Sequence, residues 1–335
     1  MRLPALGIDV AQVSLTVFLL LEEGRCQGGE FSNDAKGFEQ LQRWLRRQLD
    51  QQRNIKVWVC LEATGRYSDA IAHYLYQQEW VKQVSVLNPS RIATYGKSQL
   101  RRSKNDKADA KLIAHFAATQ DAEAWQPPSA QQQSLQELTR HRDNLLDSRQ
   151  QVRNRLKAGV RTAGVQRQLS EQEELLTRQL AEVEAEIAQQ IKADDSLHHQ
   201  FRLLCSIPGV GPILAAHFLA EVPDVARFES ASQLAAFAGL VPTQGESGTS
   251  VKRKSKLAKS GNVHLRKAFY MPALSAARHN PLIAAFVARL RAVGDKAKMT
   301  IVAAVMHKLL RLAYGVLKSN QPFDPHFADK HQFAP

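Results

Sequence analysis

Apolar residues along the first 125 positions alternate between short unbroken runs and stripes that repeat every three or four residues. Short runs rich in Val, Ile and Leu are typical of buried strands, and the stripes are typical of helices with one face on a core. We expect strands within 6–32, with interruptions at Glu22-Glu23-Gly24 and Gly28-Gly29. Two more strands are expected at 55–64 and 84–89. Helices are expected at 33–52 (capped by Asn33/Asp34), 69–80 and 107–120. The order of three strands, helix, strand, helix, strand, helix predicts an α/β domain whose mixed sheet is covered on both faces.

The pattern changes after a stretch rich in Pro and Gln at residues 125–133, which is typical of a domain boundary. Between 134 and 200, apolar residues recur every seven positions, as at Leu138, Leu145 and Val152, with almost no Gly or Pro. Such heptads predict two long helices with coiled-coil seams that turn near residues 161–170. An intramolecular hairpin and a dimerisation arm both account for the heptads, and the spacing does not choose between them.

From residue 201 the pattern is one of shorter helices separated by loops. The sequence therefore predicts four parts: an α/β domain, a helical coiled-coil segment, a mostly helical C-terminal domain and a short tail. Their expected ranges are 1–125, 126–200, 201–325 and 326–335.

The distribution of charge along the chain indicates a binding partner. The formal net charge is +13, and residues 201–335 carry 18 basic and 7 acidic side chains. An excess gathered in one part of a chain indicates a polyanionic partner, most simply nucleic acid.

The remaining composition indicates a reduced, cytoplasmic protein. Cys26, Cys60 and Cys205 have no metal-ligand spacing, which argues against a zinc site and against disulfides. No apolar run approaches the roughly 20 residues that a membrane helix needs. The apolar stretch at 15–21 lacks the layout of a signal peptide and is read as a strand.

Two acids stand three apart at the start of the helix predicted near residue 107. With Asn105 as N-cap, Asp106 and Asp109 lie in or beside the first turn, where the helix dipole favours acids. Their spacing with Ile113 and Phe116 also puts them on the face that points at the sheet. Acids on a core-facing stripe are costly unless they are paired or bind a metal.

Two further acids interrupt apolar runs. Asp9 lies inside the first predicted strand, and Glu62 closes a later one. If these strands are neighbours and the helix leans its N-terminus across them, four carboxylates meet at one point. Such a density of oxygen ligands suits Mg²⁺ or Mn²⁺, and two ions about 3.5–4 Å apart can clamp a phosphodiester during its cleavage.

Three motifs carry a resemblance to a known family. GIDVA at 7–11, LEATG at 61–65 and NDKADA at 105–110 resemble a RuvC-like DEDD catalytic domain, which has the ribonuclease H fold. With SIPGVGPILAAHFLAEV at 206–222 and QLAAFAGLVP at 233–242, nearly the whole chain resembles the IS-one-ten type DEDD transposases of bacterial insertion sequences, whose relatives include the Piv pilin-gene invertase.

The resemblance implies both an activity and a set of site residues. The activity is DNA recombination: cutting, strand exchange and rejoining for transposition of an insertion sequence. The implied metal-binding and catalytic tetrad is Asp9, Glu62, Asp106 and Asp109, with Mg²⁺ (or Mn²⁺) as the cofactor.

A small polar loop runs into a basic stretch at residues 241–254. A hydroxyl delivered there beside bound phosphates can attack phosphorus and form a phosphoserine link, although a plain glycine-rich turn also fits. Chemistry alone leaves Thr243, Ser247, Thr249 and Ser250 open. The resemblance implies that Ser247 is the nucleophile.

The resemblance also implies how the chain assembles and what guides it. Serine and tetrad are expected from different subunits of a homo-oligomer, a dimer or tetramer. A structured non-coding bridge RNA is expected to pair with donor and target DNA, which agrees with the lack of an obvious base-reading module in the sequence.

Two other segments are predicted to contact nucleic acid. The turn in SIPGVGPILA resembles a helix-hairpin-helix, in which Gly209 and Gly211 expose backbone N–H groups to a phosphate; an ordinary tight turn is the alternative. A run of seven basic residues without an acid forms the second segment, expected to bind the nucleic-acid backbone. It comprises Lys252, Arg253, Lys254, Lys256, Lys259, Arg266 and Lys267.

Three other functions compete with the recombinase. In a metal-dependent, structure-specific nuclease, water replaces Ser247 as the nucleophile. A sugar-kinase-like ATPase shares a motif like GIDVA but needs a second acidic-glycine phosphate loop and an adenosine site, neither of which the sequence offers. A catalytically silent nucleic-acid-binding protein does not need the four acids in apolar segments.

Overall fold

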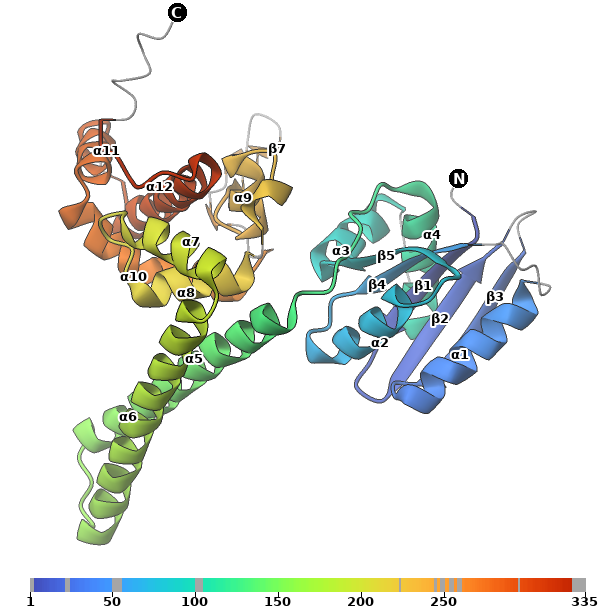
Figure 1. Cartoon of the computed structure of the whole chain (residues 1–335), viewed down its shortest axis with the longest axis horizontal. Coiled ribbons are helices and arrows are strands. Elements are labelled where there is room, and N and C mark those ends of the chain that lie inside the picture. Colours follow the sequence, from blue (N-terminus) through green and yellow to red (C-terminus); the bar gives the residue numbers. More distant parts are fainter. Residues whose placement is uncertain are drawn as a thin grey trace, which may run out of the picture. The chain divides into compact units, whose positions relative to one another are not determined.

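The computed structural model describes residues 3–21, 25–49, 56–99, 105–222, 224–243, 246–247, 251–252, 256–257, 261–294 and 296–326. For residues 243, 246–247, 251–252 and 256 the description covers the backbone alone. The chain divides into two compact units, Met1–Pro127 and Pro128–Pro335, and each is considered by itself (Figure 1).

The first unit is built on a five-stranded mixed sheet with the strand order β3-β2-β1-β4-β5. Strand β1 pairs antiparallel with β2 and parallel with β4, and β4 pairs parallel with β5. The predicted mixed α/β fold is therefore confirmed. The strands are β1 (Ala5–Val10), β2 (Ser14–Leu20), β3 (Cys26–Ser32), β4 (Val57–Glu62) and β5 (Val81–Leu87).

Helices cover both faces of this sheet (Figure 1). Side chains alternate along a strand, so β1 sends Leu6 and Ile8 into one apolar cluster and Ala5 into another. The first cluster contains apolar residues of α1 (Ala35–Gln48) and α2 (Arg66–Tyr76), and the second those of α3 (Pro89–Ser98) and α4 (Asp106–Thr119). The two faces of β1 therefore belong to two helix layers.

Two elements of the first unit, α3 and β3, depart from the sequence prediction. Helix α3 was not predicted, although Asn88 caps it and Pro89 occupies its first turn. The Gly28-Gly29 pair was predicted to interrupt a strand and instead lies inside β3, paired with β2. A Cβ at Gly29 would come within 2.9 Å of the Phe31 ring, so glycine fits a close approach rather than a break here.

The second unit begins with a long helical hairpin, α5 (Ala130–Lys157) and α6 (Ala163–Lys192), which confirms the two predicted long helices. Buried seam residues such as Leu145, Val152 and Leu180 join the core of this unit. The heptads are thus satisfied within one chain. The turn lies earlier than predicted, because Gly159 with φ +87° ends α5 and residues 163–170 are already helical.

The rest of the second unit packs on the same core as the hairpin. It also contains two short antiparallel strand pairs between α9 and α10. The helices are α7 (Asp195–Cys205), α8 (Pro212–Glu221), the 3₁₀ helix η2 (Val225–Arg227), α9 (Ala231–Phe237), α10 (Val263–His279), α11 (Pro281–Ala292) and α12 (Lys298–Ser319). This part of the chain is mostly helical, as predicted.

Helix α12 is long and apolar enough to cross a membrane by length and composition. A core helix of a soluble protein meets the same criterion, and Val305, Leu309 and Ala313 of α12 lie in the core of the second unit. Among the described residues no other helix meets it. The helix is therefore weak evidence for a membrane span.

Candidate functional site

Asp9 and Glu62 lie at the same edge of the sheet. In the parallel pair β1–β4, Gly7 stands opposite Cys60 and Ile8 opposite Leu61, so the next step of the register places Asp9 level with Glu62. Because side chains alternate, Asp9 shares the face of Gly7, and Glu62 shares that of Cys60. Cys60 belongs to the cluster formed with α3 and α4, so both acids are on the α4 face of the sheet.

Helix α4 crosses β1 directly over Gly7. A Cβ on Gly7 would lie 2.2 Å from the backbone nitrogen of Ala114 and 2.3 Å from the carbonyl oxygen of Ala110. The helix backbone can approach the strand this closely only because residue 7 is glycine. Asp106 lies one turn before Ala110, and Asp9 lies two residues beyond Gly7 on the same face.

The direction of α4 brings its first turn to the edge that carries Asp9 and Glu62. After the helix, the chain returns to the first half of β5, where the Trp125 N–H donates to Val84 O at 2.7 Å and the Gln83 amide donates to Ala122 O at 2.7 Å. Val84 pairs with Val59, near the start of β4. The end of α4 therefore faces the amino ends of the parallel strands, and its start faces their carboxyl ends.

Asn105 caps α4 as predicted, with its side chain accepting from the Ala108 N–H at 2.8 Å. Asp109 is half-buried and Asp106 is exposed, while Ile113 and Phe116 further along are buried. The prediction that both acids sit on a core-facing stripe is thus wrong for Asp106. The first turn of α4 extends beyond the covered part of the sheet, and only later turns pack on it.

All four acids are carboxylates on one face and one edge of the first unit, and three of them, Asp9, Glu62 and Asp109, are half-buried. Their oxygen donors are of the type that Mg²⁺ and Mn²⁺ prefer. As the side chains are placed, the described part of the chain contains no group of three or more His, Cys, Asp and Glu gathered closely enough to hold a metal ion. The backbone thus brings the acids to one edge, whereas the side chains do not close on a common point.

The side chain of Asn33, which the sequence predicted as part of a helix cap, instead connects the segments that follow β1 and β4. Asp34 alone caps α1, accepting from the Gly37 N–H at 2.7 Å. The Asn33 amide donates to the carbonyl oxygens of Ala11, after β1, and Tyr67, in the first turn of α2, each at 2.9 Å. Asn33 therefore fixes the carboxyl ends of β1 and β4 relative to each other.

Ser247 lies in the second unit, within a nested pair of short strand ladders. Strand β6 (Pro242–Thr243) pairs with β9 (Lys256–Leu257), and between them β7 (Glu246–Ser247) pairs with β8 (Val251–Lys252), which sets Ser247 opposite Val251. We call residues 242–257 the serine segment. The structure describes the backbone of Ser247 and not its side chain.

The chain that leaves the serine segment is anchored at Gly261 and Asn262. Gly261 has φ +112°, and a Cβ there would lie 2.5 Å from the Gly239 nitrogen, so only glycine fits. The Asn262 N–H donates to Phe237 O at 2.7 Å, and its side chain caps α10. The segment thus leaves beside the end of α9, close to where it enters.

Glu221 accepts a hydrogen bond from Asn262 and so stabilises this anchor. The sequence patterns did not predict a role for Glu221. It is 4% exposed, and it accepts from Arg140 of α5 at 2.9 and 3.1 Å and from the Asn262 amide at 2.6 Å. Burial alone would raise the pKa of Glu221, but the hydrogen bonds from Arg140 and Asn262 outweigh it and hold that pKa below its ordinary value. One buried carboxylate therefore links the helical hairpin to the N-cap of α10, which follows the serine segment.

The two glycines predicted to bind phosphate have different surroundings. Gly209 has φ +100°, and a Cβ there would lie 2.5 Å from the Cβ of Ala276 in α10, so packing already requires glycine at this turn. Gly211 caps α8 and has open space beside it. The phosphate contact stays a prediction for both.

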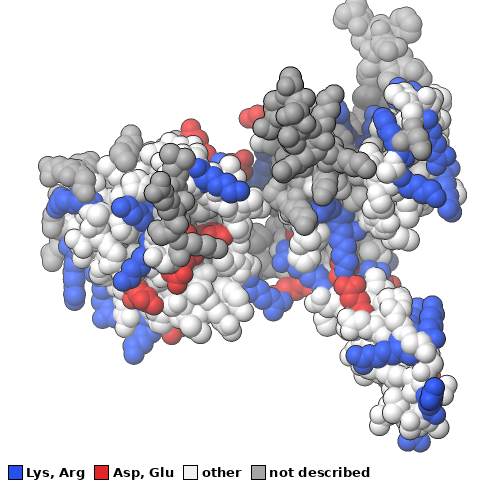
Figure 2. Space-filling model, turned by 180° about the vertical axis from the view of Figure 1, so that it is seen from behind, with Lys and Arg blue, Asp and Glu red and all other residues white. Residues whose placement is uncertain are grey.

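Few of the predicted basic contacts can be placed. Arg253, Lys254 and Lys259 lie outside the described residues, and Lys252 and Lys256 are described by backbone alone. Arg266 and Lys267 lie in the first turns of α10, and the Lys267 ammonium is 2.8 Å from Asp147. Figure 2 shows further Lys and Arg side chains over the visible faces of both units.

Comparisons with known proteins define the class of this chain, namely enzymes that rearrange DNA. Residues 201–288 match the model of the transposase IS116/IS110/IS902 family, and residues 6–165 match a transposase model of the IS110 DEDD type. The pilin gene-inverting proteins of Moraxella bovis and Moraxella lacunata are each 32% identical to this chain, over 95% of it and 97% of their own lengths.

A further relative is the transposase for insertion sequence element IS1111A of Coxiella burnetii, 29% identical over 58% of this chain and 59% of its own length. The chain belongs to the IS116/IS110/IS902 family of transposases. This confirms the family predicted from the sequence motifs.

Proposed function

We propose that this protein is the transposase of an insertion sequence, which cuts and rejoins DNA through a covalent link to Ser247. The observation that carries the proposal is the gathering of Asp9, Glu62, Asp106 and Asp109 on one face and one edge of the sheet. We assign the first unit to the RuvC-like, ribonuclease H type and keep the four-part division of the chain at 125, 200 and 325.

The acids fit a divalent cation by chemistry and by backbone position. Asp106 is exposed at the first position of α4 and the other three acids are half-buried, so all four carboxylates are at least partly accessible to an ion from solvent. When bound, Mg²⁺ or Mn²⁺ supplies Lewis acidity at the phosphate oxygens. Asp9 and Glu62, fixed to neighbouring strands, provide the rigid half of the ligand set, and the first turn of α4 provides the other half.

In the proposed step, the Ser247 oxygen forms a bond to phosphorus while the bond from phosphorus to a deoxyribose oxygen breaks. The serine proton leaves and a proton reaches the departing oxygen, so a DNA hydroxyl is released. The phosphoserine conserves the energy of the phosphodiester, and another DNA hydroxyl can reverse the step without ATP. The seven basic residues around the serine segment hold the flanking phosphates.

The partners we propose are donor and target DNA, a non-coding bridge RNA and further copies of this chain. The net positive charge of residues 201–335 supports a polyanionic partner, and the family supports DNA. The RNA and the sharing of a site between subunits rest on the family resemblance. A nucleoid-associated, cytoplasmic location follows from the same proposal.

Ser247→Ala is the decisive variant. We expect it to abolish strand cutting and recombination while nucleic-acid binding and divalent-cation binding stay intact. Wild-type protein on a DNA substrate that blocks rejoining should give a protein–DNA adduct that survives denaturation, with the link mapped to Ser247 by peptide mass spectrometry. Ser250→Ala, the same change in the same loop, is the control and should cut normally.

Wild-type cutting by Ser247→Ala would refute the serine mechanism. Metal-dependent hydrolysis by water, as in a structure-specific nuclease, then becomes the better assignment for the same four acids. A covalent link at another hydroxyl of the loop would refute the choice of Ser247.

A further inference from the structure

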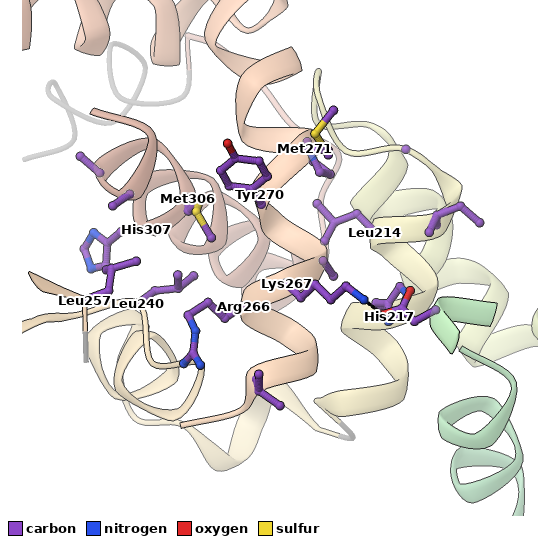
Figure 3. A pocket seen from close by; sticks show the side chains of 18 of the residues that line it. Leu214, His217, Leu240, Leu257, Arg266, Lys267, Tyr270, Met271, Met306 and His307 are labelled. Carbon is purple, nitrogen blue, oxygen red and sulfur yellow. Dashed lines mark ion pairs between the residues drawn. The ribbon is translucent and has the colours of Figure 1, made fainter. Parts of the chain in front are cut away.

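A large cavity of about 1370 Å³ opens in the second unit, between α8, α10 and α12 and beside the serine segment. Pro242 of β6 and Leu257 of β9, which frame the serine segment, are part of its lining. Figure 3 shows Leu257, Leu240 and His307 together in one part of the cavity and Lys267 and His217 in another. The cavity therefore adjoins the part of the molecule to which we assign the chemistry.

The walls of this cavity are mainly apolar and adaptable. All three methionines after residue 1, Met271, Met299 and Met306, line it, and Tyr270 lies among them. Met271 and Met299 are 66% and 61% exposed, and Tyr270 is 38% exposed, so the walls remain open to solvent. Methionine side chains adapt their shape to a flat guest, and an open tyrosine ring offers a stacking surface.

One corner of the cavity is polar and buried. His217 is 2% exposed, and its Nε2 lies 3.3 Å from the Asp143 carboxylate. Burial alone would raise the pKa of Asp143, but His217 and the cations Lys267 and Arg142 outweigh it and lower that pKa. The Nε2 atom of His217 therefore faces a carboxylate whose pKa is lowered.

The other ring nitrogen of His217 lacks a hydrogen-bond partner in the described structure. Nδ1 is buried and has no hydrogen-bond partner among the residues that the structure describes. A buried ring nitrogen without a partner is costly, and a ligand that brings a hydrogen-bonding group to this corner lowers that cost. The cavity thus combines stacking walls with one polar corner formed by His217, Asp143 and Lys267.

A flat molecule with apolar faces and a polar edge fits these requirements, and a nucleobase has that chemistry. We propose that the cavity receives an unpaired nucleotide, with its base against Tyr270 and the methionines and its polar edge toward the corner of His217. Arg266 and Lys267, on the same helix as Tyr270, line the cavity where the sugar-phosphate would enter. The inference rests on the proposed function, because it assumes that this unit handles nucleic acid.

The nucleotide would be held next to the serine segment. Withdrawing a base from its stack costs unstacking energy, and that cost is smallest for a mismatched or already single-stranded base. The cavity would accordingly select a distorted strand over an intact duplex. DNA and bridge RNA both supply unpaired nucleotides, and the experiment separates them.

The test uses the full-length Ser247→Ala protein, so that binding is measured without cutting. Its probes are two short single-stranded oligonucleotides, one DNA and one RNA, each with a single 5-iodouracil. We expect photo-cross-linking to place at least one probe on residues 263–279. A cross-link from the DNA probe assigns the nucleotide to DNA, and one from the RNA probe assigns it to RNA. Cross-links only outside the cavity lining overturn the proposal.

Two pairs of variants test the walls. Tyr270→Ala should weaken oligonucleotide binding about tenfold, and Tyr270→Phe, which keeps the ring, should restore it. Ala304→Phe places a ring into the cavity from α12 and should weaken binding similarly, whereas Ala288→Phe on the exposed surface of α11 should not. Unchanged affinity of Ala304→Phe overturns the site.

The remaining outcomes keep this inference separate from the proposed function. Loss of self-association by Ala304→Phe with unchanged oligonucleotide affinity would show that the cavity is an interface between copies, and would overturn the proposal. Cavity cross-links together with a wild-type protein that forms no adduct at Ser247 would support the nucleotide site while refuting the serine chemistry.

Discussion

At the scale of single residues, the four acids differ in how firmly the fold holds them. Asp9 and Glu62 belong to paired strands, whereas Asp106 is exposed at the first position of a helix. Removing the charge of one ligand weakens a cation site and leaves the basic residues of the second unit unchanged.

Asp9→Asn and Asp106→Asn should therefore each abolish strand cutting while leaving nucleic-acid affinity nearly unchanged. A cleavage assay beside a gel-shift assay measures both, and excess chelator should reproduce the variants in the wild-type protein. Glu79→Gln, at an exposed acid just before the amino end of β5, should behave as wild type. Normal cutting by either Asp variant, or in chelator, contradicts the metal assignment.

Glu221 gives a prediction on stability and pH. Its pKa is lowered from 4.5 in the folded protein, so its contribution is fully present above about pH 4.5 and is lost as the pH falls through the lower, folded value. Glu221→Gln should lower the free energy of unfolding at pH 7 by about 2 kcal/mol, because it weakens charged hydrogen bonds to Arg140 and Asn262.

Denaturant titrations at several pH values measure this difference, which should shrink as the pH falls below 4.5. Glu171→Gln is the matched control: Glu171 is exposed and 3.8 Å from an exposed Arg167, so its loss should change stability by less than about 0.5 kcal/mol. A difference that is constant with pH would mean that Glu221 acts by packing alone.

At the scale of elements, the approach of α4 to β1 decides where the acids meet. The helix backbone touches the strand at Gly7, within a distance that no side chain permits. Any residue larger than glycine must push α4 away from β1 and with it the turn that carries Asp106 and Asp109.

Gly7→Ala should lower the free energy of unfolding by about 3 kcal/mol or more and weaken divalent-cation binding. Thermal unfolding and cation titration by calorimetry give the two values. Gly28→Ala in β3, where a Cβ would be no closer than 3.6 Å to any atom, should cost less than about 1 kcal/mol. Equal effects of the two changes would contradict the close helix–strand contact.

At the scale of the whole molecule, the prediction concerns how many chains assemble. The seam between α5 and α6 is buried inside one hairpin, yet Val165 and Leu175 on α6 remain 45% and 44% exposed. Recombination needs several strands cut together, so we expect at least a dimer formed through residues 134–200.

Light scattering, with and without nucleic acid, should show a mass of at least two chains. Leu175→Glu should reduce it without unfolding the hairpin, and the neighbouring exposed Gln172→Glu should not. A monomer under both conditions would contradict the assembly and leave the hairpin as a purely intramolecular element.

The sequence by itself determined the local features of this protein. Apolar periodicity is a property of neighbouring residues, so it located the strands, the long helices and the cap at Asn105, and it marked Asp9 and Glu62 as acids in strands. Its errors were also local: α3 was overlooked, and Gly28-Gly29 was taken for a break because the approach of Phe31 is not visible in the sequence.

Only the tertiary structure decided which residues that are distant in the sequence become neighbours. The pairing of β1 with β4 joins Asp9 and Glu62 across about fifty residues, and Glu221 meets Arg140 and Asn262 from helices that no periodicity connects. The cavity likewise combines residues of α8, α10 and α12. Such contacts depend on which apolar faces pack together over the whole chain, and the free energy that selects them is not contained in any local pattern.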